Sequence, residues 1–274
     1  VGVPVPIPPN YTQGKFTDGP DTMPATSGPT GLWIDQFATK MGLAQPRASS
    51  NGGTNYATGS AQTGFNASFP LAGVPYVGDQ LGLFAAANAT GLPSNALYVF
   101  WAGANDIFVG GKGTSAANNI EGYISSLSSA GAKNFLWLNL PNLSSGFQSF
   151  DTQFATDLAA LDSSGVNVVG VDVESLFNAI LASPAAYGFT DTTDPAWCGP
   201  GALPNCAAND PNQFLLWDGT HPTTAADALV AQLAYNDVLD LTGTSVPEPS
   251  EAALVLIGLC GLALFGRQRV KTGK

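Results

Sequence analysis

Three short apolar runs constrain the fold of this chain more than any other feature of its sequence. Residues 96–102 read ALYVFWA, residues 134–140 read NFLWLNL and residues 166–173 read VNVVGVDV. Runs of this length with little alternation are typical of strands that are buried on both faces, as in a parallel sheet. Segments with helical spacing of apolar residues separate the runs. The sequence therefore predicts an α/β protein with βαβ units and a parallel, doubly wound sheet.

The expected helices lie at residues 32–43, 78–89, 116–130, 150–161, 176–182 and 223–241. Residues 46–75 are instead rich in Gly, Ser, Asn and Thr, which predicts a long loop, and loops of that length tend to be functional. In a parallel α/β sheet the ligand site lies outside the carboxyl ends of the strands. Reactive side chains are therefore expected directly after the apolar runs and in the long loop.

The charge of the chain limits its partners. Its 274 residues carry a net charge of −11. Four of the basic residues stand together at the end of the chain, namely Arg267, Arg269, Lys271 and Lys274. The rest is therefore more acidic still, and such a balance repels phosphate backbones and argues against a nucleic-acid partner.

The stretch WDGTHP, residues 217–222, contains His221, the single histidine of the chain. Asp218 precedes it by three positions in an expected turn. An aspartate placed so can accept a hydrogen bond from one ring nitrogen and leave the other available, as a general base requires. The alternative is a solvent-facing histidine at the start of the last helix.

Two further positions could stabilise an oxyanion. Asn105 follows the first apolar run in the sequence GAND, on the expected ligand side of the sheet, where its amide could donate to a developing oxyanion. An Asx-turn after the strand is the structural alternative. Gly59, in the loop sequence NYATGSA, could present a backbone N–H to a ligand, although a flexible loop explains this glycine as well.

Taken in order along the chain, several segments resemble the GDSL (SGNH) family of serine esterases and lipases. They are TQGKFTDGP, GGTNYATGSAQTG, WAGANDIF, LNLPNLS, VESLFNAILASPAAYGFTDTTDPAWC and WDGTHPT. The resemblance implies a flavodoxin-like three-layer α/β/α fold and ester hydrolysis through an acyl-enzyme, with no metal and no cofactor. It also implies that His221 is the general base, that Asp218 orients it, and that Gly59 and Asn105 are oxyanion donors.

The family's nucleophile does not have a counterpart in this sequence. That serine belongs to a Gly-Asp-Ser motif at the end of the first strand, and neither the motif nor a strand-like run occurs before Leu32. We therefore expect an N-terminally truncated chain that lacks the first strand and is inactive as given. Ser60, Ser144 and Ser145 do not follow the pattern of a strand-to-helix elbow, so none of them is expected to substitute.

The expected substrate is an ester, and lipids, short-chain esters and acetylated glycans all remain open. One alternative function is that of a catalytically inactive SGNH-fold surface or biofilm-matrix protein. A third, carbohydrate binding through Trp33, Trp101 and Trp137, is disfavoured because Trp101 and Trp137 lie in predicted buried strands.

The C-terminal segment has a composition of its own. A Val-Pro-Glu-Pro motif precedes an unbroken apolar run, residues 252–265, and a basic end. About 15 helical residues span only ~22 Å of a ~30 Å hydrocarbon core. A buried helix is therefore an alternative to a membrane span, although Arg267 and Arg269 can snorkel to the interface. The motif consists of Val246, Pro247, Glu248 and Pro249.

The order of motif, apolar run and basic end resembles the PEP-CTERM sorting signal of Gram-negative bacteria. That resemblance implies export, recognition by an exosortase, transient anchoring in the inner membrane through a transmembrane helix, and a mature protein at the cell surface or outside the cell. The expected division of the chain is a hydrolase domain at 1–241, a linker at 242–251 and a hydrophobic sorting helix with its basic end at 252–274. In an exported protein the spacing of Cys198 and Cys206 also predicts a local disulfide, with two free thiols as the alternative.

Overall fold

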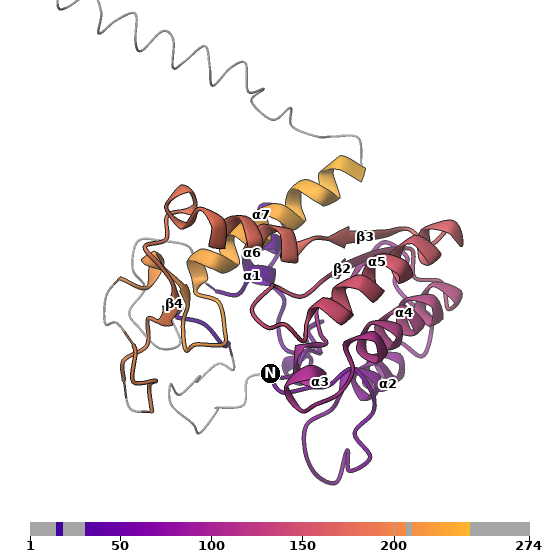
Figure 1. Ribbon diagram of the computed structural model, residues 1–274. Helices are drawn as coiled ribbons and strands as arrows, with labels where there is room; N and C mark the ends of the chain where they lie inside the picture. Colours follow the sequence, from indigo (N-terminus) through magenta and orange to yellow (C-terminus); the bar gives the residue numbers. More distant parts are fainter. Residues whose placement is uncertain (1–14, 19–30, 200, 207–209, 242–274) are drawn as a thin grey trace, which may run out of the picture. The chain divides into compact units, whose positions relative to one another are not determined.

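The computed structural model (Figure 1) describes residues 15–18, 31–199, 201–206 and 210–241. The chain divides into two units, Val1–Asp237 and Val238–Lys274, and of the second unit only the end of one helix is described. The predicted linker with its Val-Pro-Glu-Pro motif and the predicted hydrophobic helix lie outside the described residues. Within the described ranges, each helix is too short or too polar to span a bilayer.

The main sheet has three parallel strands in the order β1-β2-β3. These are β1 (Leu97–Phe100), β2 (Asn134–Leu138) and β3 (Val168–Val171). Leu97 pairs with Asn134, and Phe135 pairs with Val168. Each strand lies inside one of the three apolar runs, so the predicted parallel α/β sheet is confirmed.

Seven α-helices are described. They are α1 (Trp33–Lys40), α2 (Val77–Ala87), α3 (Ala104–Phe108), α4 (Gly113–Ser129), α5 (Gln148–Ser163), α6 (Val173–Ala182) and α7 (Thr224–Leu241). Six of them were predicted from helical spacing. The exception is α3, whose five residues are too few to show a period. The long loop between α1 and α2 contains one short 3₁₀ turn, Ser49–Asn51, and two more such turns lie at Pro184–Tyr187 and Pro211–Gln213.

A second, two-stranded parallel sheet was not predicted. It pairs β4 (Asp191–Pro195) with β5 (Phe214–Leu216). The sequence of β4 is DTTDP, which has no apolar alternation and therefore gives no strand signal. This small sheet matters for function because β5 runs directly into the predicted base and its aspartate.

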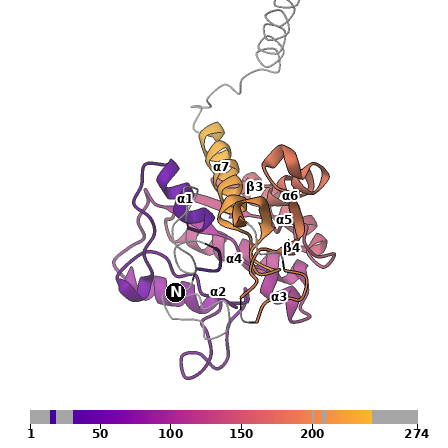
Figure 2. The ribbon, with the colours of Figure 1, turned by 90° about the vertical axis from the view of Figure 1, so that its left-hand side faces the viewer.

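Helices cover both faces of the main sheet. In Figure 1, α4 and α5 lie on one side of β2 and β3, and α6 and α7 lie on the other; Figure 2 shows the same elements turned by 90°. Trp137 of β2 points toward α5, since its ring centroid lies 4.6 Å from that of Phe154. Leu136 and Leu138 point the opposite way along the strand and are also fully buried. The predicted three-layer arrangement is therefore confirmed.

The three tryptophans considered for carbohydrate binding, Trp33, Trp101 and Trp137, pack inside the domain. Trp33 and Trp137 are buried, and the Trp33 ring meets that of Trp101 edge to face at 5.4 Å. The indole N–H of Trp101, which follows β1, donates to the carbonyl of Asn139 after β2. Together these contacts leave the three rings engaged inside the domain.

Candidate active site

The predicted base and its aspartate form one compact turn after β5. The Asp218 carboxylate accepts backbone hydrogen bonds from Thr220 at 3.0 Å and His221 at 2.8 Å through Oδ1. Its Oδ2 lies 2.7 Å from His221 Nδ1. With Nδ1–H donating to a carboxylate that the turn itself holds in place, Nε2 is the nitrogen that can accept a proton in chemistry.

The turn depends on Gly219, whose φ of +87° lies in the left-handed region that favours glycine. A Cβ at this position would also come within 2.6 Å of Leu203. The backbone N–H of Trp217 donates to the carbonyl of His221 at 2.8 Å, and this bond joins the two ends of the turn. The Asp-Gly-Thr-His sequence thus allows the carboxylate of Asp218 and the imidazole of His221 to meet within four residues.

The predicted disulfide is present and lies beside this turn. Cys198 and Cys206 are joined, with their Cα atoms 5.3 Å apart, so the free-thiol alternative is wrong for this structure. The bridged loop begins where Trp197 N–H donates to the carbonyl of Trp217 at 2.8 Å, at the end of the small sheet. Leu203 of the same loop packs toward Gly219. The disulfide therefore closes a loop that contacts the histidine turn.

A hydrogen bond joins the two segments that carry the predicted oxyanion donors. Asn105 is the second residue of α3, which begins directly after Gly103, and its side-chain amide donates one hydrogen bond to the carbonyl of Ala61 at 3.0 Å. Ala61 is two residues beyond Gly59 in the long loop. In the alternative, an Asx-turn, the side-chain oxygen of Asn105 would accept a local backbone N–H; among the described residues the side chain instead donates to the Gly59 loop.

Asp106 and Thr63 reinforce this junction, and the sequence pattern did not single them out. The Asp106 carboxylate accepts from the backbone N–H of Thr63 at 2.9 Å and from its hydroxyl at 2.8 Å. Tyr123 donates to the carbonyl of Thr63, and Asn119 donates to its hydroxyl. Thr63 is fully buried, so these bonds fix the end of the Gly59 loop onto α3 and α4.

The ring of Phe16 contacts both the predicted base, His221, and the predicted oxyanion donor Gly59. The ring centroids of Phe16 and His221 are 4.7 Å apart with an interplanar angle of 31°. An added Cβ on Gly59 would lie 2.6 Å from Cε2 of the same Phe16 ring. The structure therefore brings Gly59 and His221, which are far apart in sequence, into contact with a single side chain.

The short segment that carries Phe16 is tied down on both sides. Lys15 forms an ion pair with Asp35 at 2.9 Å. The Thr17 hydroxyl donates to the carbonyl of Pro222, next to His221, at 3.2 Å. Asp18 accepts from the backbone N–H of Thr224 at 2.6 Å, at the positive end of the α7 dipole. Sequence reasoning placed this segment in the family pattern but did not assign it a contact with the base.

Several carboxyl groups of the domain have shifted pKa values. Burial raises the pKa of Asp227, in the first turn of α7, well above its ordinary value, and nearby Asp18 acts in the same direction. Burial also raises the pKa of Asp151, in the first turn of α5, to about 7. In Asp172 the hydrogen bonds from Ser175 and Asn139 outweigh burial and lower the pKa. Among the described residues, no three His, Cys, Asp or Glu side chains come together as metal ligands.

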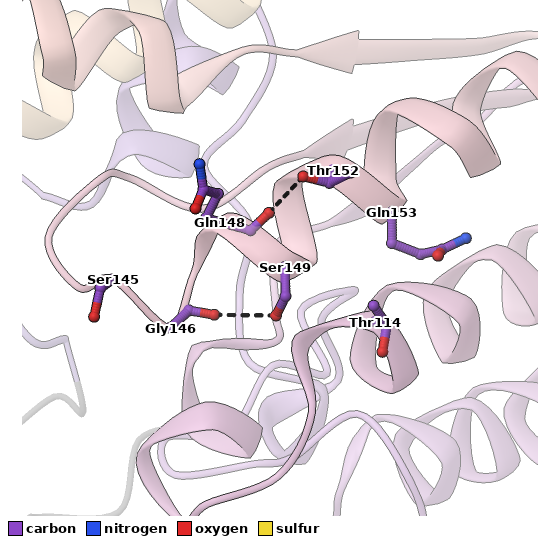
Figure 3. A pocket seen from close by; sticks show the side chains of 7 residues that line it. All are labelled: Thr114, Ser145, Gly146, Gln148, Ser149, Thr152 and Gln153. Carbon is purple, nitrogen blue, oxygen red and sulfur yellow. Dashed lines mark hydrogen bonds between the residues drawn. The ribbon is translucent and has the colours of Figure 1, made fainter.

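A separate hollow of about 410 Å³ contains none of the predicted site residues. It is lined by Thr114, Ser145, Gly146, Gln148, Ser149, Thr152 and Gln153, around the first turns of α4 and α5 (Figure 3). Two of its hydroxyls are engaged locally, since Ser149 donates to the carbonyl of Gly146 and Thr152 to that of Gln148. With no carboxylate or histidine in the lining, Ser145 has no base there that could activate it.

Comparison with known proteins agrees with this arrangement. The profile of the family described as GDSL-like Lipase/Acylhydrolase matches residues 11–234. The thermolabile hemolysin of Vibrio parahaemolyticus is 29% identical over 170 residues, which cover 51% of this chain and 40% of the hemolysin.

Two GDSL esterases/lipases of Arabidopsis thaliana are also similar. One is 34% identical over 74 residues, covering 24% of this chain and 20% of the plant protein. The other is 32% identical over 96 residues, covering 31% and 24% respectively. The chain therefore spans less than half the length of these curated relatives. Since the family profile covers the loop with Gly59, α3 and the Asp218–His221 turn, the chain belongs to the GDSL-like lipase/acylhydrolase family.

Proposed function

We propose that this protein hydrolyses carboxylic esters by acyl transfer to a serine and then to water. The observation that carries the proposal is the Asp218–His221 pair, with 2.7 Å between Oδ2 and Nδ1 and a carboxylate fixed by two backbone donors. This geometry is what a general base needs in order to hold one tautomer and stabilise its own imidazolium. Family membership supports the same chemistry.

In the proposed reaction, Nε2 of His221 takes the proton of the serine hydroxyl while the serine oxygen attacks the ester carbonyl. The resulting oxyanion accepts hydrogen bonds from the backbone N–H of Gly59 and from the second amide proton of Asn105, whose first amide proton is bound to Ala61. His221 then gives its proton to the departing alcohol. Water repeats the sequence on the acyl-enzyme and releases the acid, so that the serine and the base are regenerated.

We propose that the serine lies in a Gly-Asp-Ser segment at the end of a further parallel strand beside β1. The 274 residues contain no such triplet. Among the described residues, β1 is an edge strand of the main sheet. Asn105 stands five residues after the end of β1, in the helix that follows this strand, so a strand paired there would deliver its carboxyl end next to the oxyanion donors. Residues 1–274 alone are then expected to show no esterase activity above background.

The central experiment measures kcat and KM of the full-length protein on activated esters of increasing acyl length and on acetylated glycans. His221→Ala is expected to abolish turnover with an unchanged circular dichroism spectrum, and Asp218→Asn to leave a small remainder. Asn105→Ala should lose roughly 10²–10³ in kcat, as for other oxyanion donors. Asn178→Ala, an exposed asparagine on α6, is the matched control and should keep the wild-type rate.

Two outcomes would contradict the proposal. Wild-type turnover in His221→Ala would exclude His221 as the base, and no other histidine of these 274 residues could replace it. A full-length protein that is inert on every ester would instead favour a catalytically inactive scaffold at the cell surface.

We also propose that the C-terminal segment sorts the protein to the surface of a Gram-negative cell. The support is the order of Val-Pro-Glu-Pro, apolar run and basic end in residues 246–274. In a host with an exosortase, mass spectrometry of the mature protein should find a new C-terminus near Pro247–Pro249. Deleting residues 246–274 should leave esterase activity unchanged and abolish surface delivery. Protein in the soluble fraction that still carries residues 250–274 would exclude this role for the tail.

A further inference from the structure

We propose that Phe16 determines the ester specificity of this site, because its ring forms the apolar wall against which the substrate group next to the reacting carbonyl packs. The proposal rests on the function proposed above and extends it to a residue outside the base and the oxyanion donors. Its starting point is that one ring contacts both His221 and Gly59.

The position of the ring follows from what the reaction requires. The carbonyl oxygen must reach the N–H of Gly59, and the atoms that exchange a proton must reach His221. A side chain in van der Waals contact with both groups is therefore within reach of whatever is attached to the reacting carbon. Phe16 is half-buried, so its contacts with His221 and Gly59 lie near the surface of the domain.

The surroundings of Phe16 continue the wall with apolar material. Phe16 and the half-buried Trp197 pack against a small cluster of buried residues that includes Phe214 and Trp217. Leu203 of the disulfide loop, which packs toward Gly219 of the histidine turn, is 47% exposed. Exposed apolar side chains beside a predicted base are what an apolar substrate group needs, since its burial there removes it from water.

The charged side chains of Lys15 and Asp18, close to Phe16 in the sequence, are bound to other partners and leave the wall apolar. Lys15 is paired with Asp35, and Asp18 is bound to the first turn of α7. These contacts, with the bond from Thr17 to the carbonyl of Pro222, fix the backbone on both sides of Phe16. The Phe16 ring is therefore carried by a backbone segment of fixed position, which favours selection of substrates by their shape and by their apolar contact with the ring.

The first test does not depend on turnover. Because His221 is the single histidine, its imidazole protons give the only histidine signals in the NMR spectrum and its carbethoxylation by diethyl pyrocarbonate reports one site. Phe16→Ala should shift the imidazole signals downfield, through loss of the ring current, and increase the carbethoxylation rate. Phe65→Ala, an exposed phenylalanine that packs on Tyr123, is the control and should change neither. Unchanged signals in Phe16→Ala would overturn the contact on which the proposal depends.

The second test uses the full-length protein and two substrate series, one with growing acyl chains and one with growing alkyl alcohols. Phe16→Ala should lower kcat/KM roughly tenfold for the longer members of one series, with little effect on the shortest ester. Phe16→Leu keeps apolar bulk and should restore most of the preference, which also guards against a folding defect in the alanine variant. An equal change for all chain lengths, or a general gain in rate, would mean that Phe16 is structural or obstructs the site, and would overturn the proposal.

The two proposals fail in different ways. If His221→Ala retains turnover, the esterase mechanism is wrong whatever Phe16 does. If turnover depends on His221 but both substrate series are unaffected by Phe16→Ala, the mechanism stands and the specificity role is wrong.

Discussion

Replacing Asp151 with asparagine should make the stability of this domain less dependent on pH. Asp151 is 6% exposed, its Oδ1 accepts from the backbone N–H of Leu140 at 2.9 Å, and its Oδ2 has no hydrogen-bond partner. Burial, and to a smaller extent Glu174 and Asp172, raise its pKa from 3.8 to about 7. Asparagine has nearly the same shape, can still accept from Leu140, and carries no charge at any pH.

The sign and size of the effect follow from the pKa of the carboxyl group. The folded protein binds this proton more tightly than the unfolded chain, so the associated stability is present below pH 3.8 and is lost as the pH rises from 3.8 to about 7. Between pH 5 and pH 7 the unfolded chain is ionised at Asp151 while the folded chain is not. At about 1.4 kcal/mol per pH unit, the wild type should lose about 2.5 kcal/mol between pH 5 and pH 8 through this group alone.

The assay is urea unfolding followed by tryptophan fluorescence at pH 5 and pH 8, with free energies from linear extrapolation. Comparing the pH 5-to-8 difference in Asp151→Asn with that in the wild type cancels any cost of the substitution that does not depend on pH. Asp162→Asn, on the exposed side of the same helix, should keep the wild-type difference. If Asp151→Asn loses as much stability between the two pH values as the wild type, the carboxyl group is not held neutral by burial and the reasoning is wrong.

Three further substitutions test how the site is held. Replacing Cys198 and Cys206 with serine should lower the free energy of unfolding by about 2.5 kcal/mol through loop-closure entropy, and a reductant should reproduce this loss in the wild type but not in the variant. Asp106→Ala removes the carboxylate that binds both donors of Thr63 and should cost on the order of 3 kcal/mol, with faster proteolysis in residues 56–62 as the local readout. Asp18→Ala removes the anion at the first turn of α7 and should cost about 1 kcal/mol in denaturant unfolding; Asp18→Asn should cost less.

The parts of the fold that the sequence predicted are those with a local signal. The three apolar runs form β1, β2 and β3, because a strand that is covered on both faces buries the side chains of both faces and therefore carries few polar residues. Asp218 and His221 are three residues apart, so a single turn brings them together. The contact between Asn105 and the Gly59 loop spans 44 residues, but it follows from the rule that strand ends and functional loops meet at one edge of a parallel sheet.

What the sequence did not predict depends on distant partners. β4 is polar and becomes a strand only because β5 pairs with it. Phe16 stands in a segment with no periodic pattern, and nothing local indicates that its ring meets a histidine more than two hundred positions away. The catalytic roles of Gly59, Asn105, Asp218 and His221 stay predictions until the variants are measured.

The hydrogen bonds between the Phe16 segment and the start of α7 also determine when, during synthesis of the chain, the site can form. The hydrogen bond from Thr17 to Pro222 spans 205 residues, and the one from Thr224 to Asp18 spans 206. At a synthesis rate of ~5–20 residues per second, Asp18 leaves the ribosome about 10–40 s before its partner exists. Contacts of such long range also form late, because closing a large loop costs entropy before any contact is gained. The aromatic ring can therefore reach the histidine only after residues 221–224 have been made, and a nascent or C-terminally clipped chain that ends before them carries the Phe16 wall without the base.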